Sequence, residues 1–364
     1  MKRLLTLILV LLMVMSMLSG CGGSTSPGSG GSDDGSAAPA NAVVIKFAHA
    51  GAIMEGDPQH EGALYFEKIL EERSNGYYDV QVFGSTQLGD TVTKLEGIQS
   101  GIIEMGDIES GPTVSFVPAE ALWDMPYMFV SWDHAHDMID GELGDMVAEK
   151  WLDIGIEVLG YNDGGFRHFS NSKRPICTPA DLNGVKIRTM ESEVMVAALN
   201  ALGCSAMPLA FGEVYSALQQ GAIDGVETPY NLIFSQAYYE VEKYISPTGH
   251  FFFLRHYLAN SDWLASQPED MQALIRECAA EACAKQRELN YAAQQQYKTD
   301  LVDKYGMELN EVDIAPFIQI AQEEFWPTQY ERIGKILGDG TAESGKAVMD
   351  MIAESAKEYT YDLA

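Results

Sequence analysis

The stretch "QPEDMQALIRECAAEACAKQRELNYAAQQQYKTDLVDKY" (267–305) limits the possible folds more than any other part of the chain. It contains no Gly and no Pro after Pro268, and it is rich in Ala, Glu, Gln and Leu, which are strong helix formers. About 36 residues at 1.5 Å each make a helix about 55 Å long, which is longer than one lobe is wide. Its apolar residues do not keep a heptad, so a helix lying across two lobes explains the pattern better than a coiled coil.

Shorter segments before it alternate between strand and helix patterns. "AVVIKFAHA" (42–50) and "YYDVQVFG" (77–84) are typical of strands, and each precedes a helical pattern, at 58–74 and at 91–100. Asp57 followed by a proline is a favourable start for the first of these helices. The alternation predicts the α/β class, with mainly parallel sheets.

An internal similarity suggests two related halves. "IQSGIIE" (98–104) and "LQQGAID" (218–224) share the pattern aliphatic-Gln-x-Gly-x-Ile-acid. In each, we expect a helix to end at the glycine, Gly101 or Gly221, and a short strand to follow. Such a match also arises by chance, so the pattern alone does not decide the fold.

The N-terminus indicates export. Lys2 and Arg3 precede an apolar run (4–18) that is too short for an ordinary membrane-spanning helix and suits a signal peptide over residues 1–20. The run ends in "LSGC", which resembles the bacterial lipoprotein signal, so Cys21 is expected to carry a lipid anchor. The alternative is a chance cysteine after a signal peptide that is cut nearby.

Residues 21–42 have the composition of a flexible linker, because "GGSTSPGSGGSDDGSAAPA" (22–40) has almost nothing apolar to bury. About 320 residues then remain, which is enough for two lobes of ordinary domain size. No later run is apolar enough to span a bilayer.

Charge limits the possible partners. The full chain has 23 Lys+Arg against 53 Asp+Glu, and cleavage of the signal peptide removes two of those cations. So acidic a protein is a poor partner for nucleic acid, and a small anion could bind only in a locally positive pocket. The cysteines that follow the linker are expected to be small buried residues: Cys177, Cys204, Cys278 and Cys283. No Cys/His spacing suggests a structural metal, and nothing indicates a cofactor.

One strand pattern makes the scarcity of cations important. In "GVKIRTM" (184–190), Val185, Ile187 and Thr189 alternate with polar residues, as in a half-buried strand. One interpretation places both cations of this strand, Lys186 and Arg188, in water. The other holds Arg188 for an anionic ligand.

Residues 167–263 resemble the substrate-binding proteins of TRAP transporters, the DctP-like family. The resemblance rests on "GGFRHFSNSKRPICTPADLNGVKIRTM", on the long run "FGEVYSALQQGAIDGVETP", and on "YEVEKYIS" followed by Gly249–His250. "IKFAHA" (45–50) and "STQLGD" (85–90) agree with it, so the similarity extends from about residue 43 onward.

The resemblance implies a periplasmic-binding-protein-like fold with two α/β lobes around a cleft, joined by hinge strands and crossed by a long helix. We expect lobe I over 43–163 plus 251–300, and lobe II over 164–250 plus 301–364. It also implies that a small organic anion is bound as the lobes close. The implied partners are the small and large membrane permease subunits, driven by an ion gradient.

Two arginines match arginines of the family. Arg188 matches the Arg of "G-x-K-[IL]-R", which the family uses to hold the ligand carboxylate, and a guanidinium meets a carboxylate with two charge-assisted hydrogen bonds. Arg167, in "GGFRHFS", matches an arginine that approaches the ligand or braces the first. An ordinary salt bridge is the alternative for Arg167. Lys186, two residues before Arg188, is expected to point the same way by the alternation of the strand, although its side chain could end outside the cleft.

Two further positions belong to the same resemblance. Phe211 matches an aromatic residue that lines the family's pocket, with core packing as the alternative. Thr228 stands where many members have an Asn that donates to the ligand, so the hydroxyl supplies one donor in place of the amide's two. Tyr230 and Asn231 are near enough in sequence to compensate.

Two acids of the first half match positions that face polar ligand groups in sialic-acid-binding members. Asp90 and Glu109 are these candidates, and each could instead cap a helix or lie on the surface. His49 is a weaker candidate. "DHAHD" (133–137) has the composition of a metal site, but two histidines two residues apart on a helix point in different directions, so we expect a solvated surface there.

A secreted hydrolase is the rival class. The chain has no Gly-x-Ser-x-Gly, no His-Glu-x-x-His and no Walker lysine loop. A lipoprotein that senses an anion for a signalling receptor remains open, and the sequence does not choose among dicarboxylates, 2-oxo acids, sugar acids, aromatic acids and amino acids.

Overall fold

The computed structural model of the chain describes residues 42–362. These belong to the second of two units into which the chain divides, Ala38–Ala364. The expected signal peptide, Cys21 and almost all of the expected linker lie outside the described residues. Within the described part, no helix is both long and apolar enough to cross a membrane.

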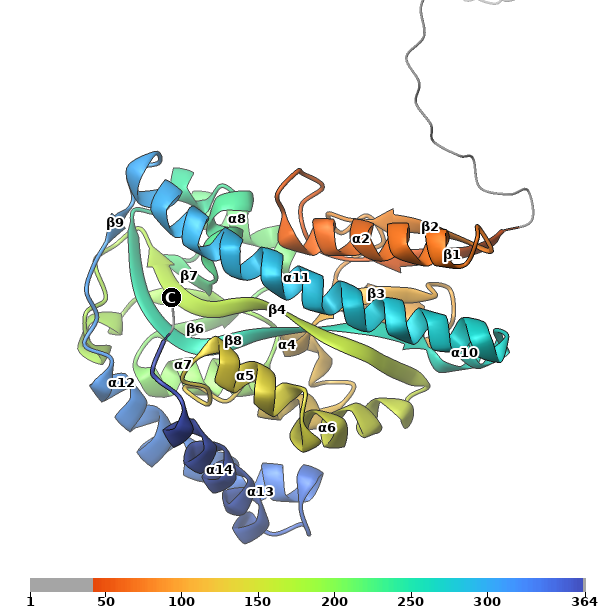
Figure 1. The fold of residues 1–364 in the computed structure, drawn as a ribbon. Coiled ribbons are helices and arrows are strands. Elements are labelled where there is room, and N and C mark those ends of the chain that lie inside the picture. The colour runs from red at the N-terminus through yellow and green to blue at the C-terminus, as the bar shows by residue number, and fades with distance from the viewer. Residues whose placement is uncertain (1–41, 363–364) are drawn as a thin grey trace, which may run out of the picture. The chain divides into compact units, whose positions relative to one another are not determined.

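A nine-stranded mixed sheet organises this unit, and its two sides are separate groups of short strands (Figure 1). The strand order is β2-β1-β3-β8-β4-β7-β5-β6, with β9 paired to β8. The bounds are β1 Val43–Ala48, β2 Tyr78–Phe83, β3 Met105–Glu109, β4 Ile156–Asn171, β5 Lys186–Thr189, β6 Ser205–Pro208, β7 Gly225–Thr228, β8 Tyr244–Asn260 and β9 Glu308–Leu309. We use "first lobe" for the part around β1–β3 and "second lobe" for the part around β5–β7.

The two longest strands join the lobes. β4 and β8 pair antiparallel along most of their length, whereas β1 pairs parallel with both β2 and β3, and β5 pairs parallel with both β6 and β7. The β4–β8 register shifts between Asp163 and Gly165, beside the expected lobe boundary. An irregular register interrupts the ladder at the crossing between the lobes.

The helices cover both lobes. Their bounds are α2 Pro58–Arg73, α3 Thr91–Gln99, α4 Ser110–Thr113, α5 Trp132–Ile139, α6 Glu142–Leu152, α7 Glu193–Leu202, α8 Val214–Gln219, α9 Tyr230–Ser235, α10 Ser261–Ser266, α11 Glu269–Asp303, α12 Ala315–Gln319, α13 Trp326–Leu337 and α14 Ala342–Ser355. A π-helical segment, Ile320–Phe325, joins α12 to α13. The alternation of strands and helices confirms the α/β class.

The expected helix ends agree with the local chemistry. The Asp57 carboxylate accepts hydrogen bonds from the backbone N–H groups of Gln59 and His60 and so begins α2. Gly101 and Gly221 have φ angles of +73° and +68°, a backbone conformation that glycine adopts without strain. Each follows the end of a helix and precedes a strand, β3 or β7, as predicted.

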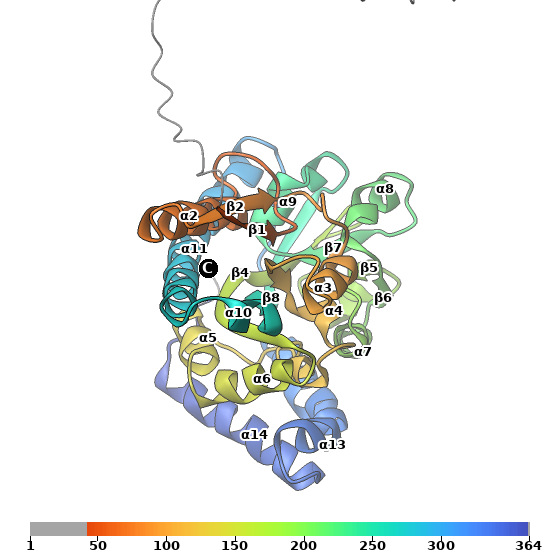
Figure 2. The same ribbon diagram turned by 90° about the vertical axis from the view of Figure 1, so that its right-hand side faces the viewer.

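Helix α11 has 35 residues and crosses both lobes, as predicted from its composition. In Figure 2 one end of it lies beside α2. Its Ile275 and Cys278 belong to the core under β1 and β2, and its Leu301 belongs to a separate core with Val226 of β7. Between these contacts, the Gln286 amide donates to the backbone oxygen of Asp163, so the helix also holds the crossing point of β4.

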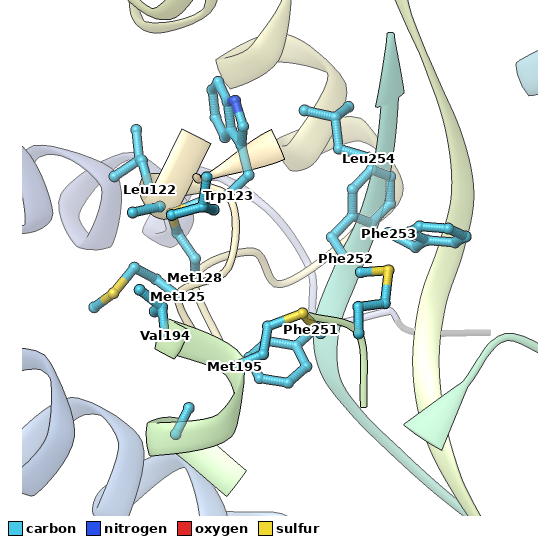
Figure 3. Close-up of a cluster of buried hydrophobic side chains, with 14 of the residues drawn as sticks. Leu122, Trp123, Met125, Met128, Val194, Met195, Phe251, Phe252, Phe253 and Leu254 are labelled. Carbon is cyan, nitrogen blue, oxygen red and sulfur yellow. The ribbon is translucent and has the colours of Figure 1, made fainter. Parts of the chain in front are cut away.

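The largest core includes residues of β4 and β8, the two strands that run between the lobes (Figure 3). It joins Trp123 and Met125 to Val194 of α7 and to Phe252 of β8. Buried residues of α13 and α14, such as Ile333, pack in the same core. The C-terminal helices therefore contact segments that the expected boundaries assign to both lobes.

The "DHAHD" segment forms part of α5 and differs from the expectation of a solvated surface. His134 is fully buried, and its Nε2 lies 2.9 Å from Ser355 Oγ. His136 is half-buried and pairs with Asp163 at 2.6 Å. The prediction holds for Asp133 and Asp137, which are exposed, and is wrong for the two histidines, because the C-terminal segment covers one side of this helix and β4 the other. The two side chains do point to different partners.

The cysteines are free thiols among the described residues. Cys204, Cys278 and Cys283 are buried, as expected, and burial raises the pKa of each thiol. Cys177 is exposed, so the expectation of a buried residue is wrong there.

Candidate ligand-binding cavity

A cavity of about 400 Å³ lies between the first and second lobes. Its lining includes all six residues that the sequence singled out for binding: Asp90, Glu109, Arg167, Arg188, Phe211 and Thr228. The size is typical of pockets for small molecules. Residues from both halves of the chain therefore meet around one space.

Arg188 lies on β5 with only 5% of its surface exposed. Its Nε and Nη2 donate to the backbone oxygen of Leu209 at 2.9 and 2.7 Å. No carboxylate within residues 42–362 forms an ion pair with it. Burial lowers the pKa of Arg188, because a charged group loses its hydration there. The donors of Nη1 and the second N–H of Nη2 remain for another partner.

Its neighbours on the strand separate the two sequence interpretations. Lys186 is exposed and does not line the cavity, whereas Ile187, Arg188 and Thr189 are all buried. The interpretation with Arg188 in water is therefore wrong, because the sheet is covered on both faces at this point.

Arg167, on β4, already has a counter-ion. Its Nε lies 2.5 Å from Glu227 Oε2, and its Nη2 donates to Glu227 Oε1 at 2.8 Å. Burial raises the pKa of Glu227, but Arg167 and the nearby His250, whose Nε2 lies 3.5 Å from Glu227 Oε2, outweigh burial and lower it to about 2. Thr189 Oγ1 also donates to Glu227, at 2.7 Å. Arg167 thus lines the cavity as a neutralised, fixed group.

Phe211 and Thr228 lie on the same side of the cavity. Phe211 is half-buried and packs against the large core while it lines the cavity, so both expectations for it hold together. Thr228 is 3% exposed, and its hydroxyl has no hydrogen bond to any described residue. Asn231 is bound to Gln294 at 2.9 Å and, like Tyr230, lies outside the lining.

Asp90 and Glu109 line the opposite side in different ways. Asp90 is exposed and caps α3 through the backbone N–H of Thr93, which lowers the pKa of Asp90. Glu109 is buried, accepts a hydrogen bond from Thr91 at 2.9 Å and lies 3.6 Å from Lys94 Nζ. Burial raises the pKa of Glu109, but Lys94 and the other partners outweigh burial, so the pKa is lowered.

Sequence reasoning missed several residues of the cavity. Arg255 and Phe253 of β8 line it, as do Gln59, Met190, Glu191 and Glu213. Arg255 lies within "FFFLRHYLAN", which is typical of a fully buried strand. An arginine inside such a run was the available signal, because a buried cation requires a partner.

His49 is fully buried but does not line the cavity. Its Nε2 lies 3.1 Å from Nδ1 of His60. Burial, together with nearby cations, lowers the pKa of His49 to about 3, so its ring is neutral near pH 7.

The comparisons with known proteins agree with this geometry. The family described as bacterial extracellular solute-binding protein, family 7 (DctP), matches residues 47–332, and the chain belongs to this family. The 2,3-diketo-L-gulonate-binding periplasmic protein YiaO of Escherichia coli is 35% identical over 70% of this chain and 77% of its own length. A solute-binding protein of Verminephrobacter eiseniae is 38% identical over 219 residues. The matched segment covers 59% of this chain and 65% of that relative.

Solved structures give the same class of fold. A TRAP periplasmic solute-binding protein from Bordetella, with density assigned to pantoate, has a TM-score of 0.78 and 30% identity, covering 87% of this chain and 99% of that one. The two-lobed α/β architecture expected from the sequence is thereby confirmed. The chain is a solute-binding protein of the TRAP type, a class that works outside the cytoplasm.

Proposed function

We propose that this protein captures a small organic acid between its lobes, with the ligand carboxylate on Arg188, and delivers it to the small and large permease subunits of a TRAP transporter. The observation that supports it most is a buried guanidinium without a carboxylate partner among the described residues. A buried charge is costly until it is paired, so this site favours an anion. Two of the similar proteins are consistent with an organic acid as ligand. YiaO is named for binding 2,3-diketo-L-gulonate, and the Bordetella structure contains density assigned to pantoate.

Arg167 contributes by position in this proposal. Its ion pair with Glu227 fixes its guanidinium, so it shapes the cavity beside Arg188 without requiring the ligand's charge. Closure of the lobes around the ligand excludes water and strengthens the new ion pair. The ligand then favours the closed state by its differential affinity for the two states.

The same proposal includes a lipid anchor on Cys21, which keeps the protein beside the permease. Radiolabelled palmitate should label the wild-type chain in a bacterial host, and Cys21→Ser should abolish the label. Equal labelling of both chains would contradict the anchor and leave the binding function untouched.

Calorimetry on the soluble chain from residue 42, with a panel of organic acids, tests the binding role. Arg188→Met should weaken binding of the best acid at least about 30-fold, because truncating one partner of a buried charge pair costs about 2–5 kcal/mol. Lys186→Met, two residues away and exposed, is the matched control and should bind as the wild type does. Equal affinity of the Arg188 variant would reject the proposed site.

The same titrations separate binding from catalysis. A hydrolase would change the acid, whereas a binding protein returns it unchanged. Mass spectrometry of the ligand released after prolonged incubation should therefore find only the starting acid. Uptake of that acid in cells with and without the permease subunits separates transport from receptor signalling.

A further inference from the structure

Strand β4 is irregular at the point where it passes from one lobe to the other. Asp163 pairs with Leu254 of β8, and Gly165 pairs with Phe253. Gly164, between them, has no partner in the described β4–β8 ladder. Gly165 has a φ angle of +84°, which other residues adopt only with strain. A bulge that contains two glycines is a place where backbone angles can change as the lobes move.

Helices α11 and α5 are both attached to this bulge. From α11, Gln286 donates to the backbone oxygen of Asp163, and Gln294 donates to that of Gly164, each at 2.8 Å. From α5, His136 Nε2 lies 2.6 Å from the Asp163 carboxylate. The bulge is therefore held by side chains as well as by the strand ladder.

Two aromatic rings pack directly on the glycines. A Cβ added at Gly164 would lie against the ring of Phe253, and a Cβ added at Gly165 would lie 2.6 Å from Cη2 of Trp132. Phe253 lines the cavity, whereas Trp132, on α5, does not. The glycines let both rings approach the backbone at the crossing point more closely than any other residue type would.

The Trp132 ring contacts each of the three long elements that run between the lobes. Its centre lies 6.2 Å from that of Phe166 on β4, 5.7 Å from that of Phe252 on β8 and 5.3 Å from that of Tyr291 on α11. Trp132 itself is only 6% exposed. A change of the angle between the lobes displaces these elements relative to one another. Because packed side chains do not deform continuously, it must also change the contacts of this ring.

We infer that Trp132 is a positioning residue for lobe closure. Packed against Gly165, it stabilises the arrangement in which both lobes line one cavity, and it does so without touching the ligand. The apparent dissociation constant of a ligand that binds only this arrangement varies inversely with the population of the arrangement. A change at Trp132 therefore alters the affinity for every acid by the same factor. This link to affinity rests on the proposed function, whereas the packing at the bulge does not.

Distances between the lobes in the ligand-free protein test the inference without any ligand. Cys177 is an exposed thiol on the second-lobe side, and Glu96→Cys adds an exposed thiol on α3 of the first lobe. The remaining cysteines of residues 42–362 are buried, so spin labels attach at these two positions. Pulsed electron paramagnetic resonance of the soluble chain should give a distance distribution that Trp132→Phe changes.

Trp326→Phe is the matched control. Trp326 is 4% exposed and packs in the same core as Trp132, but it lies on α13. Its variant should leave the distances as in the wild type. If circular dichroism shows that Trp132→Phe does not fold, Tyr291→Ala gives the same test, because it removes the contact between the Trp132 ring and α11 from a half-exposed side chain.

Calorimetry measures the effect on affinity. The probes are D-gluconate, succinate, pyruvate and phenylacetate. Trp132→Phe should weaken the two that the wild type binds most tightly by the same factor, about three- to tenfold, as expected from the loss of aromatic contacts. Trp326→Phe should bind both as the wild type does. A purely structural role would lower the denaturant midpoint of both tryptophan variants and leave their affinities equal.

The outcomes separate this inference from the proposed function. An unchanged distance distribution or an unchanged affinity of the folded Trp132 variant would overturn the inference. A factor that differs between the two acids would also overturn it, because it would indicate contact with the ligand. If the wild type binds none of the acids, the proposed function fails, and the distances alone decide whether Trp132 positions the lobes.

Discussion

The two walls of the cavity differ in whether their buried cations have an acidic partner. On the second-lobe wall, Arg167 is paired with Glu227, and Arg188 beside it has only a backbone carbonyl. On the first-lobe wall, Lys94 faces Glu109 and Arg255 faces Asp107. One wall therefore leaves a cation for the ligand to neutralise, while the other wall is balanced in charge before the ligand arrives.

The difference shows that residue type alone does not identify a binding residue. Arg167, Arg188 and Arg255 are all buried and all line the cavity. What distinguishes them is the counter-ion that the fold supplies. Variants that add or remove a counter-ion therefore test the comparison directly.

Glu227→Ala should have the largest effect on stability. It leaves Arg167 buried without its counter-ion, which costs about 3–5 kcal/mol when one partner of a buried pair is removed. Urea denaturation of the ligand-free protein measures the loss. Asp350→Ala removes the partner of Lys346 in an exposed pair and should change little. Equal effects of the two variants would mean that burial does not distinguish these pairs.

Lys94→Met tests the first-lobe wall in the same way. The Glu109 carboxylate would stay buried with fewer partners, at a cost of about 1–3 kcal/mol. Because the pKa of Glu109 is lowered in the folded protein, its charge contributes stability above its usual pKa and loses it as pH falls through the lowered value. The difference between variant and wild type should therefore shrink in acid. A difference that grows as pH falls would contradict this pairing.

Glu242 extends the comparison to a buried carboxyl that forms no ion pair with any residue of 42–362. Burial raises its pKa to about 8, against the hydrogen bond that Ser170 donates to it. The folded protein then binds a proton that the unfolded chain has released, so stability falls as pH rises from about 4.5 to 8. Glu242→Gln should be more stable than the wild type at pH 8 by on the order of 4 kcal/mol, and by less than about 1 kcal/mol at pH 5. Denaturant midpoints at the two pH values measure this, and parallel curves would contradict it.

Thr228→Val should have the smallest effect. It removes a hydroxyl that has no hydrogen bond within the described chain and keeps the shape of the side chain. Affinity for the acid should fall about three- to tenfold, because one neutral hydrogen bond contributes about 0.5–1.5 kcal/mol. Thr228→Ser keeps the hydroxyl and is the control. An unchanged affinity of the valine variant would exclude Thr228 from direct contact with the ligand.

Much of the fold follows from local patterns in the sequence. The absence of Gly and Pro in 269–303 predicts α11, and the proline after Asp57 predicts the start of α2. The motif around Arg188 predicts that its side chain lines the cavity. The structure adds that Arg188 forms no ion pair with a described carboxylate. These features depend on neighbours in sequence or on one recognisable segment.

The rest depends on contacts between distant segments. Arg167 and Glu227 are 60 residues apart, so their pairing and the neutral state of that wall are not visible in either motif. Arg255 meets Asp107 only through the pairing of β3 with β8. The burial of His134 likewise depends on Ser355, far along the chain. Local sequence patterns do not contain such pairings.

The buried guanidinium of Arg188 has a practical consequence for how the protein is handled. A cation that lacks a counter-ion binds any small anion that fits, so phosphate, sulfate or acetate in the buffer competes with the physiological acid. Apparent dissociation constants should rise linearly with the concentration of such an anion, from the value measured without it, even at constant ionic strength. Ligand screens in phosphate buffer would then miss weak ligands that screens in a buffer of bulky anions detect.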